Sequence, residues 1–235
     1  MAGKTKKHTG LVALIAVILF AAVVTGGILI GTDRFPSLES LFRSPKESGS
    51  VVNNSDLTLS VIDVGQGDSI LLTAGGKAVL VDAGPAASSQ AVLDYLDANG
   101  VRKLDWVVAT HAHEDHVAAL PYLYELGYRG NVYGTEETIR LARGFMKKWA
   151  DFVTSAGGRL PFSVETMNRV AFSTISLGSQ VVEGLSVTAG RSGHMLGSCW
   201  LRFEHGGKSL LYTGDMTLAG RLLATDLPPE SDGAV

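Results

Sequence analysis

Six consecutive residues, His111 to His116, carry three imidazoles and two carboxylates. Imidazole and carboxylate suit zinc, with iron and manganese as alternatives, so this density of ligand side chains favours a bound metal ion. An apolar run at 106–110 precedes the stretch, and an apolar pattern with helical spacing at 117–126 follows it. We therefore expect the stretch on a loop between a strand and a helix, which indicates an α/β or α+β fold.

The spacing within this stretch predicts two adjacent metal positions. His111 and His113 are two residues apart on an extended segment, so their side chains point to the same side and can hold one ion. Asp115 and His116 begin the following helix and project toward a neighbouring position. Two ions about 3.5–4 Å apart can clamp the attacking and the leaving oxygen of a displacement reaction. Zinc is the expected ion at both positions.

Further ligands must come from elsewhere in the chain, which has 6 histidines in all. His194 lies in a glycine-flanked loop between two expected strands, where a ligand is plausible. Asp215 follows an expected strand and, in the company of these histidines, is expected to bridge the two ions. His205 lies at the tip of an expected hairpin and is interpreted as solvated. The single cysteine, Cys199, excludes a cysteine-rich zinc site and is expected in the core of a strand.

The N-terminal quarter of the chain differs in composition from the rest. Residues 1–10 are basic, and the run 11–30 has no charge, so a helix there would span about 30 Å, the thickness of a bilayer core. We expect a transmembrane anchor at 11–31, with a cytoplasmic N-terminus and the rest outside; a cleaved signal peptide and a buried core helix are the alternatives. Residues 32–55 are interpreted as a linker, and 56–235 as an extracytoplasmic catalytic domain, which would be secreted after cleavage.

Within that domain, alternation of apolar and polar residues predicts strands, and helical spacing between capping residues predicts helices. Residues 63–68 are interpreted as a turn. Two facing mixed sheets with helices on both outer faces, an αββα sandwich, accommodate this order of elements. The expected strands are 57–62, 69–73, 77–81, 104–109, 131–133, 180–183 with 185–189, 199–204 and 208–212, and the expected helices are 88–99, 115–126, 135–150 and 164–170.

The H-x-H-x-D-H spacing at 111–116, followed by Gly-His at 193–194 and Gly-Asp at 214–215, resembles the metallo-β-lactamase superfamily. Within that superfamily, the longer string at 110–122 is similar to the β-CASP nucleases, which process RNA and DNA. The opening string at 61–69 is similar to a different branch, the metallo-hydrolase domain of ComEC-type competence proteins. Both branches handle nucleic acid, and the resemblance implies the αββα fold.

The resemblance also implies a role for each candidate residue. A metal-activated hydroxide would attack phosphorus in line, with Asp115 orienting it as a catalytic residue. Asp82, also placed in the catalytic set, would support the ligands from behind. Ser198 would contact a phosphate, with a loop-capping serine as the alternative. The implied ligands are His111, His113 and His194 for the first zinc, Asp115 and His116 for the second, and Asp215 as the bridge.

One departure from the family pattern concerns the second metal. The family supplies a late histidine to it, and no histidine follows Asp215 in this sequence. We therefore expect either an incomplete second site or an N-terminal fragment of a longer protein, with the sandwich incomplete at its C-terminus.

The residues and the resemblance together predict a zinc-dependent phosphodiesterase, most simply a nuclease acting on RNA or DNA. The net charge of −3 lacks the basic footprint of nucleic-acid binders, but a metal centre supplies its own positive charge. One alternative is a small-molecule hydrolase of the same fold that acts on a β-lactam, lactone or thioester. The other is a catalytically silent domain for DNA binding or uptake.

Overall fold

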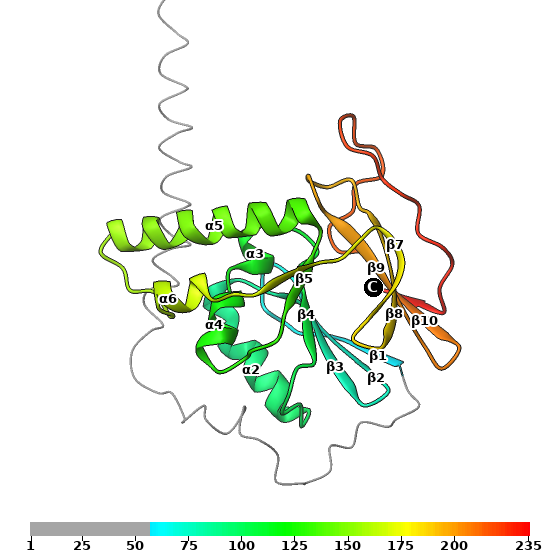
Figure 1. Cartoon of the computed structure of the whole chain (residues 1–235), viewed down its shortest axis with the longest axis horizontal. Helices are drawn as coiled ribbons and strands as arrows, with labels where there is room; N and C mark the ends of the chain where they lie inside the picture. The colour runs from blue at the N-terminus through cyan, green and yellow to red at the C-terminus, as the bar shows by residue number, and fades with distance from the viewer. Residues whose placement is uncertain (1–56) are drawn as a thin grey trace, which may run out of the picture.

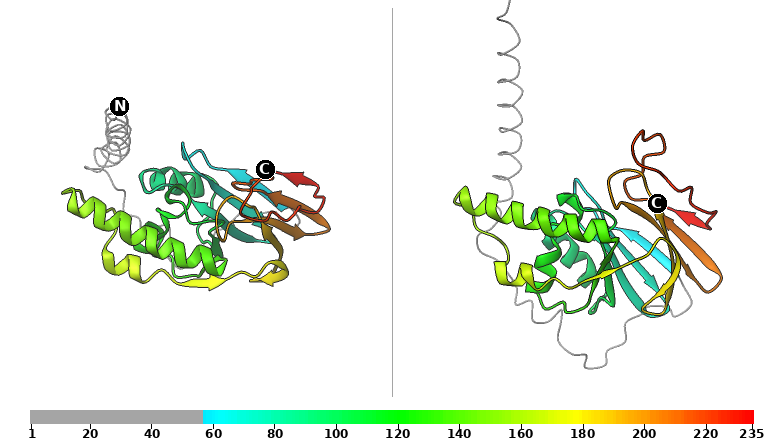
Figure 2. Two further views of the ribbon diagram at one scale, coloured as in Figure 1. Left: turned by 90° about the horizontal axis from the view of Figure 1, so that it is seen from above. Right: turned by 45° about the horizontal axis from the view of Figure 1, so that its top comes forward.

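The computed structural model describes residues 57–235, so the expectations for 1–10, 11–31 and 32–55 lie outside the described residues. Two sheets pack face to face, and the described helices lie against the outer face of the first sheet (Figure 1). The views in Figure 2 place the second sheet and the C-terminal segment on the opposite side of the first sheet from the helices. The pair of facing sheets is confirmed, but within 57–235 no helix covers the outer face of the second sheet.

The first sheet contains 6 strands that follow one another in chain order. They are β1 (Leu57–Val61), β2 (Ser69–Ala74), β3 (Lys77–Ala83), β4 (Trp106–Val108), β5 (Val132–Gly134) and β6 (Phe172–Thr174). The pairs β1–β2 and β2–β3 are antiparallel, whereas β3 to β6 run parallel. Sequence reasoning placed five of these strands and missed β6, whose residues are not fully buried and include only one apolar side chain, unlike the apolar run of β4.

The second sheet contains 5 strands in the order β11-β10-β9-β8-β7. They are β7 (Gly178–Val182), β8 (Leu185–Arg191), β9 (Cys199–His205), β10 (Lys208–Tyr212) and β11 (Gly233–Ala234). The pairs from β7 to β10 are antiparallel, and β11 adds a short parallel edge to β10.

Along the chain, the helical elements connect successive strands of the first sheet. They are η2 (Ala86–Ser88), α2 (Ser89–Ala98), α3 (Glu114–Val117), α4 (Leu120–Glu125), α5 (Glu136–Ser155) and α6 (Val164–Asn168). The single helix expected at 115–126 is wrong, because the chain forms α3 and α4 instead. Pro121 lies in the first turn of α4, where its missing N–H is tolerated. Thr135 caps α5 as expected, by accepting a hydrogen bond from the Thr138 N–H.

Two apolar cores hold the layers together. Because side chains alternate along a strand, β3 sends Leu80 into the core beneath the helices and Val79 and Val81 into the core between the sheets. In the second core, the Trp106 ring lies 6.3 Å from the Phe203 ring, measured between centroids. Fully burying each such side chain contributes about 1.5–3 kcal/mol to folding. The two cores therefore hold the strands in fixed positions, and the loops at the strand ends start from those positions.

Across residues 57–235, none of the helices combines the length and the hydropathy that crossing a bilayer requires.

Candidate metal centre

The predicted ligands gather at one edge, where loops from the two sheets meet. Because β3 and β4 are parallel, they end at the same edge, which brings Asp82 on β3 close to His111 just after β4. From the second sheet, His194 follows β8 and Asp215 follows β10. Residues that are far apart in sequence are therefore delivered to one place by the register of the strands.

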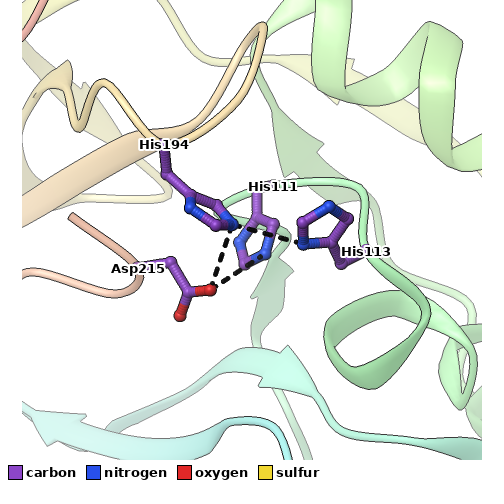
Figure 3. A group of neighbouring side chains, drawn as sticks. All are labelled: His111, His113, His194 and Asp215. Carbon is purple, nitrogen blue, oxygen red and sulfur yellow. Dashed lines mark hydrogen bonds and ion pairs between the residues drawn. The ribbon is translucent and has the colours of Figure 1, made fainter. Parts of the chain in front are cut away.

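His111, His113, His194 and Asp215 form the first group, and their ligand atoms all lie within 4.8 Å of one another. Figure 3 shows the three imidazoles and the carboxylate converging on a common point. The Nε2 atom of His194 lies 3.3 Å from Nδ1 of His113 and 3.1 Å from Oδ2 of Asp215. The predicted first ligand set, with its expected bridge, is therefore brought together.

The environment of the His111 side chain indicates that a cation fits among these four residues. The residue is 1% exposed, and its Nε2 has no hydrogen-bond partner among the described residues. A buried polar atom without a partner costs about 1–3 kcal/mol, and a cation would remove that cost. Burial lowers the pKa of His111 to about 4, so its ring is neutral at pH 7 and offers a lone pair. The donor set of three imidazoles and a carboxylate fits a divalent metal such as zinc.

His116 and two carboxylates form a second group beside the first. The buried His116 ring places Nε2 at 3.9 Å from Oδ1 of Asp115 and 3.8 Å from Oδ1 of Asp215. The other oxygen of Asp215, Oδ2, lies 3.7 Å from Nε2 of His111 in the first group. Asp215 thus presents one oxygen to each group, an arrangement that suits a bridging carboxylate.

Asp82 lies behind the ligands and is completely buried. It accepts hydrogen bonds from the Thr110 N–H at 2.8 Å, the Thr110 hydroxyl at 2.6 Å and His116 Nδ1 at 3.0 Å. Burial alone would lower the pKa of His116, but the hydrogen bond and charge of Asp82 outweigh it and raise that pKa to about 9. With Nδ1 held in this way, Nε2 faces Asp115 and Asp215. Asp82 is therefore a positioning residue and cannot touch a substrate.

The sequence as a whole agrees with this geometry. The profile of the metallo-β-lactamase superfamily matches residues 62–234. The chain belongs to the metallo-β-lactamase superfamily. The superfamily resemblance expected from the motif spacing is therefore confirmed.

Curated relatives of this metallo-β-lactamase superfamily member include nucleases. An endoribonuclease of Schizosaccharomyces pombe is 29% identical over 202 residues, which are 80% of this chain and 26% of that protein. A ribonuclease of Thermus thermophilus is 30% identical over 170 residues, which are 71% of this chain and 39% of that protein. The chain thus spans less than half the length of these relatives. Among solved structures, the FEZ-1 metallo-β-lactamase of Legionella gormanii shares 16% identity at a TM-score of 0.49, covering 66% of this chain and 60% of that one.

The loops that carry His194 and Asp215 are hydrogen-bonded to each other. The Ser192 hydroxyl donates to the Asp215 carbonyl at 2.7 Å, and the Thr217 N–H donates to the Ser192 carbonyl at 2.8 Å. Gly193 allows this close approach, because its φ of +72° suits glycine and a Cβ there would overlap the Thr225 hydroxyl. The spacing between these two ligands is therefore set by the contact between the loops that follow β8 and β10.

Gly193→Ala is expected to lower the free energy of unfolding by about 2–4 kcal/mol, the combined cost of left-handed backbone strain and a steric clash. Gly100→Ala is the matched control, because Gly100 has a similar φ of +67° and open space around it. The control is expected to lose only about 1 kcal/mol, from strain alone. Urea unfolding in the presence of a chelator measures both changes, and equal losses would contradict the clash.

Ser198 does not reach the group of ligands. It is 3% exposed, and its hydroxyl donates to the Met195 carbonyl at 2.8 Å and accepts from the Met195 N–H at 3.1 Å. This geometry supports the loop-capping alternative over a phosphate contact. His205 is half-buried beside the β2–β3 hairpin near Gly75, so its interpretation as a solvated residue is only partly right. Cys199 is buried in β9 as expected, and burial raises the pKa of its thiol to about 12.

Sequence reasoning missed one acidic residue of this edge. Asp68, in the segment interpreted only as a turn, places a carboxylate oxygen within 4.8 Å of the ligand atoms of His116 and Asp215. The available signal was its position directly before β2. Because β2 begins beside the end of the antiparallel β3, the turn finishes at the edge of the sheet where β3 ends. That signal alone does not separate a ligand from an ordinary turn aspartate.

Proposed function

We propose that this domain is a metal-dependent phosphodiesterase that cleaves nucleic acid, with RNA as the first candidate substrate. The observation that carries the proposal is the convergence of His111, His113, His194 and Asp215 around the unpartnered Nε2 of His111. The choice of RNA is supported by the names of the curated relatives, which include an endoribonuclease and a ribonuclease. The β-CASP branch is the part of the superfamily that this combination favours.

In this proposal the two groups of ligands would hold two zinc ions, with Asp215 contributing to both groups. When bound, such ions activate water and stabilise the charge that develops during phosphoryl transfer. The half-buried Asp115 orients the attacking water and accepts its proton, because its carboxylate faces the same space as His116 Nε2. Asp82 keeps the His116 ring in place through Nδ1.

A substrate panel with the purified chain tests the proposal. We expect zinc-dependent cleavage of single-stranded RNA and of bis-p-nitrophenyl phosphate, lost after chelation and restored by zinc. Hydrolysis of nitrocefin or a lactone without cleavage of RNA would instead support a small-molecule hydrolase. Bound zinc with no activity on any of these substrates would support a silent domain for DNA binding or uptake.

We further propose that residues 11–31 anchor the protein in a membrane, with the catalytic domain outside the cytoplasm. The support is the uncharged run at 11–30 after a basic N-terminus, a length that suits a bilayer core. The full chain is therefore expected to stay in the membrane pellet after alkaline carbonate extraction. Its release into the supernatant would contradict an anchor, and release together with a shortened N-terminus would identify a cleaved signal peptide.

A further inference from the structure

The segment between β1 and β2 packs directly against the helix that carries the ligand Asp115. Gly67 has a φ of +103°, and a Cβ at this position would overlap the Asp115 carbonyl oxygen. Only a residue without a side chain allows so close an approach of the two backbones. The turn at 63–68 is therefore part of the wall of the metal centre, and it delivers Asp68 to the second group.

The Asp68 carboxylate is held in place from one side only. Among the described residues it accepts one hydrogen bond, from the Tyr212 hydroxyl at 2.5 Å. Tyr212 is buried, and burial together with the charges of Asp82 and Asp68 raises its pKa above the usual range, so the hydroxyl keeps its proton. The Tyr212 hydroxyl therefore fixes Asp68 through Oδ2 and leaves other lone pairs of the carboxylate available.

The spacing of the second group suits a shared ion better than hydrogen bonds. The distances from His116 Nε2 to the oxygens of Asp115 and Asp215, 3.9 Å and 3.8 Å, are too long for hydrogen bonds. Donor atoms arranged tetrahedrally at about 2.1 Å from one zinc ion lie about 3.4 Å apart. Atoms at this separation need only a small contraction to become ligands of one ion.

The charges of the second group also favour a bound cation. Asp68 lies within 4.8 Å of the ligand atoms of His116 and Asp215, and Asp115 approaches His116 as well. No salt bridge in the described part of the chain joins any of these three carboxylates to a lysine or arginine. Carboxylates that share a site repel one another unless a positive charge lies between them. A divalent cation bound among these carboxylates supplies two positive charges.

We infer that Asp68 is a ligand of the second metal position, together with Asp115, His116 and Asp215. This inference rests on the proposed metal-dependent function. The resulting set has one imidazole and three carboxylates, whereas the first group has three imidazoles and one carboxylate. Because oxygen ligands suit harder ions, the second position is expected to accept Mn²⁺ more readily than the first.

The test compares the metal content of Asp68→Asn and Asp63→Asn in the full chain. Asp63 is the matched control, because it is an exposed carboxylate of the same turn that accepts a hydrogen bond from the Gly65 N–H. Zinc is counted by mass spectrometry after gel filtration, and the affinity of the weaker site is measured by chelator competition. The unmodified chain and Asp63→Asn are expected to hold about two ions, and Asp68→Asn about one, as in a two-metal site that has lost one position.

The affinity of the weaker site for zinc is expected to fall at least about 10-fold in Asp68→Asn. Even the loss of a residue that only hydrogen-bonds to a metal ligand costs about that much. Asp68→Glu, which keeps the charge, is expected to retain more of the second ion than Asp68→Asn. Circular dichroism confirms folding, and if Asp68→Asn is unfolded, Asp68→Glu and Asp68→Ala are compared instead, with only Asp68→Ala expected to lose the ion.

The outcomes separate this inference from the proposed function. A chain that cleaves RNA and keeps both ions at unchanged affinity in Asp68→Asn would overturn the role of Asp68 alone. A chain that loses one ion in Asp68→Asn but cleaves no RNA would support the ligand and overturn the nuclease proposal. A chain that binds a single ion with or without Asp68 would overturn the second position itself.

Discussion

Asp215→Ala is expected to reduce RNA cleavage about 10³-fold, the upper end of what removing one charge-stabilising group costs an enzyme. The reason is that Asp215 serves both groups. Its Oδ2 lies 3.1 Å from His194 Nε2, and its Oδ1 lies 3.8 Å from His116 Nε2. Losing this carboxylate would therefore remove a ligand from each of the two proposed metal positions at once, and the metal content should fall together with the activity.

The control for this variant is Asp151→Ala. Asp151 lies on α5 and forms an exposed salt bridge with Lys147, a type of pair worth about 0.3–0.5 kcal/mol. It should keep full activity and the full metal content. Initial rates on a fluorescent RNA and zinc per chain are measured for both variants. A folded Asp215→Ala that keeps its zinc and cleaves RNA at the unmodified rate would exclude Asp215 from the centre.

Asp82→Asn is expected to lower the free energy of unfolding by about 3 kcal/mol, the cost of breaking a buried charge pair. Asparagine can adopt the same backbone conformation, because it tolerates the φ of 56° that Asp82 adopts. It cannot accept at both oxygen positions, because Oδ1 accepts from the Thr110 N–H while Oδ2 accepts from the Thr110 hydroxyl and His116 Nδ1, and an amide has only one oxygen. Zinc affinity should also fall about 10- to 100-fold, as for other partners that orient a ligand imidazole.

Unfolding in urea with a chelator present isolates the stability effect from the metal. The matched control is Asp94→Asn on α2, where the exposed carboxylate bonds only to Gln90 among the described residues and should change stability by less than about 0.5 kcal/mol. Asp82→Asn with stability and zinc affinity both equal to those of the control would show that Asp82 does not position His116.

The H-x-H-x-D-H segment could be interpreted from the sequence because its chemistry is local. Alternation along an extended segment places His111 and His113 on the same side without any tertiary contact. The strands with an alternating or continuous apolar pattern were found because that pattern is local too, whereas β6, with one apolar residue, and the break between α3 and α4 depend on packing. The superfamily followed from the spacing of the motifs and agrees with the profile match at 62–234.

The sequence by itself therefore determined the ligand types, the superfamily and the candidate first group. Only the tertiary structure decided which distant residues face these ligands, because strand register and loop packing set those distances. Asp68 and Tyr212, 144 residues apart, meet because both sheets bring them to one edge. In the same way, Asp82 became a buried support with no access to substrate, and Ser198 became a loop cap. Asp115 adjoins His116 in the sequence, but Asp68, Asp82 and Asp215 come close to His116 only in the assembled fold, since no local spacing encodes those contacts.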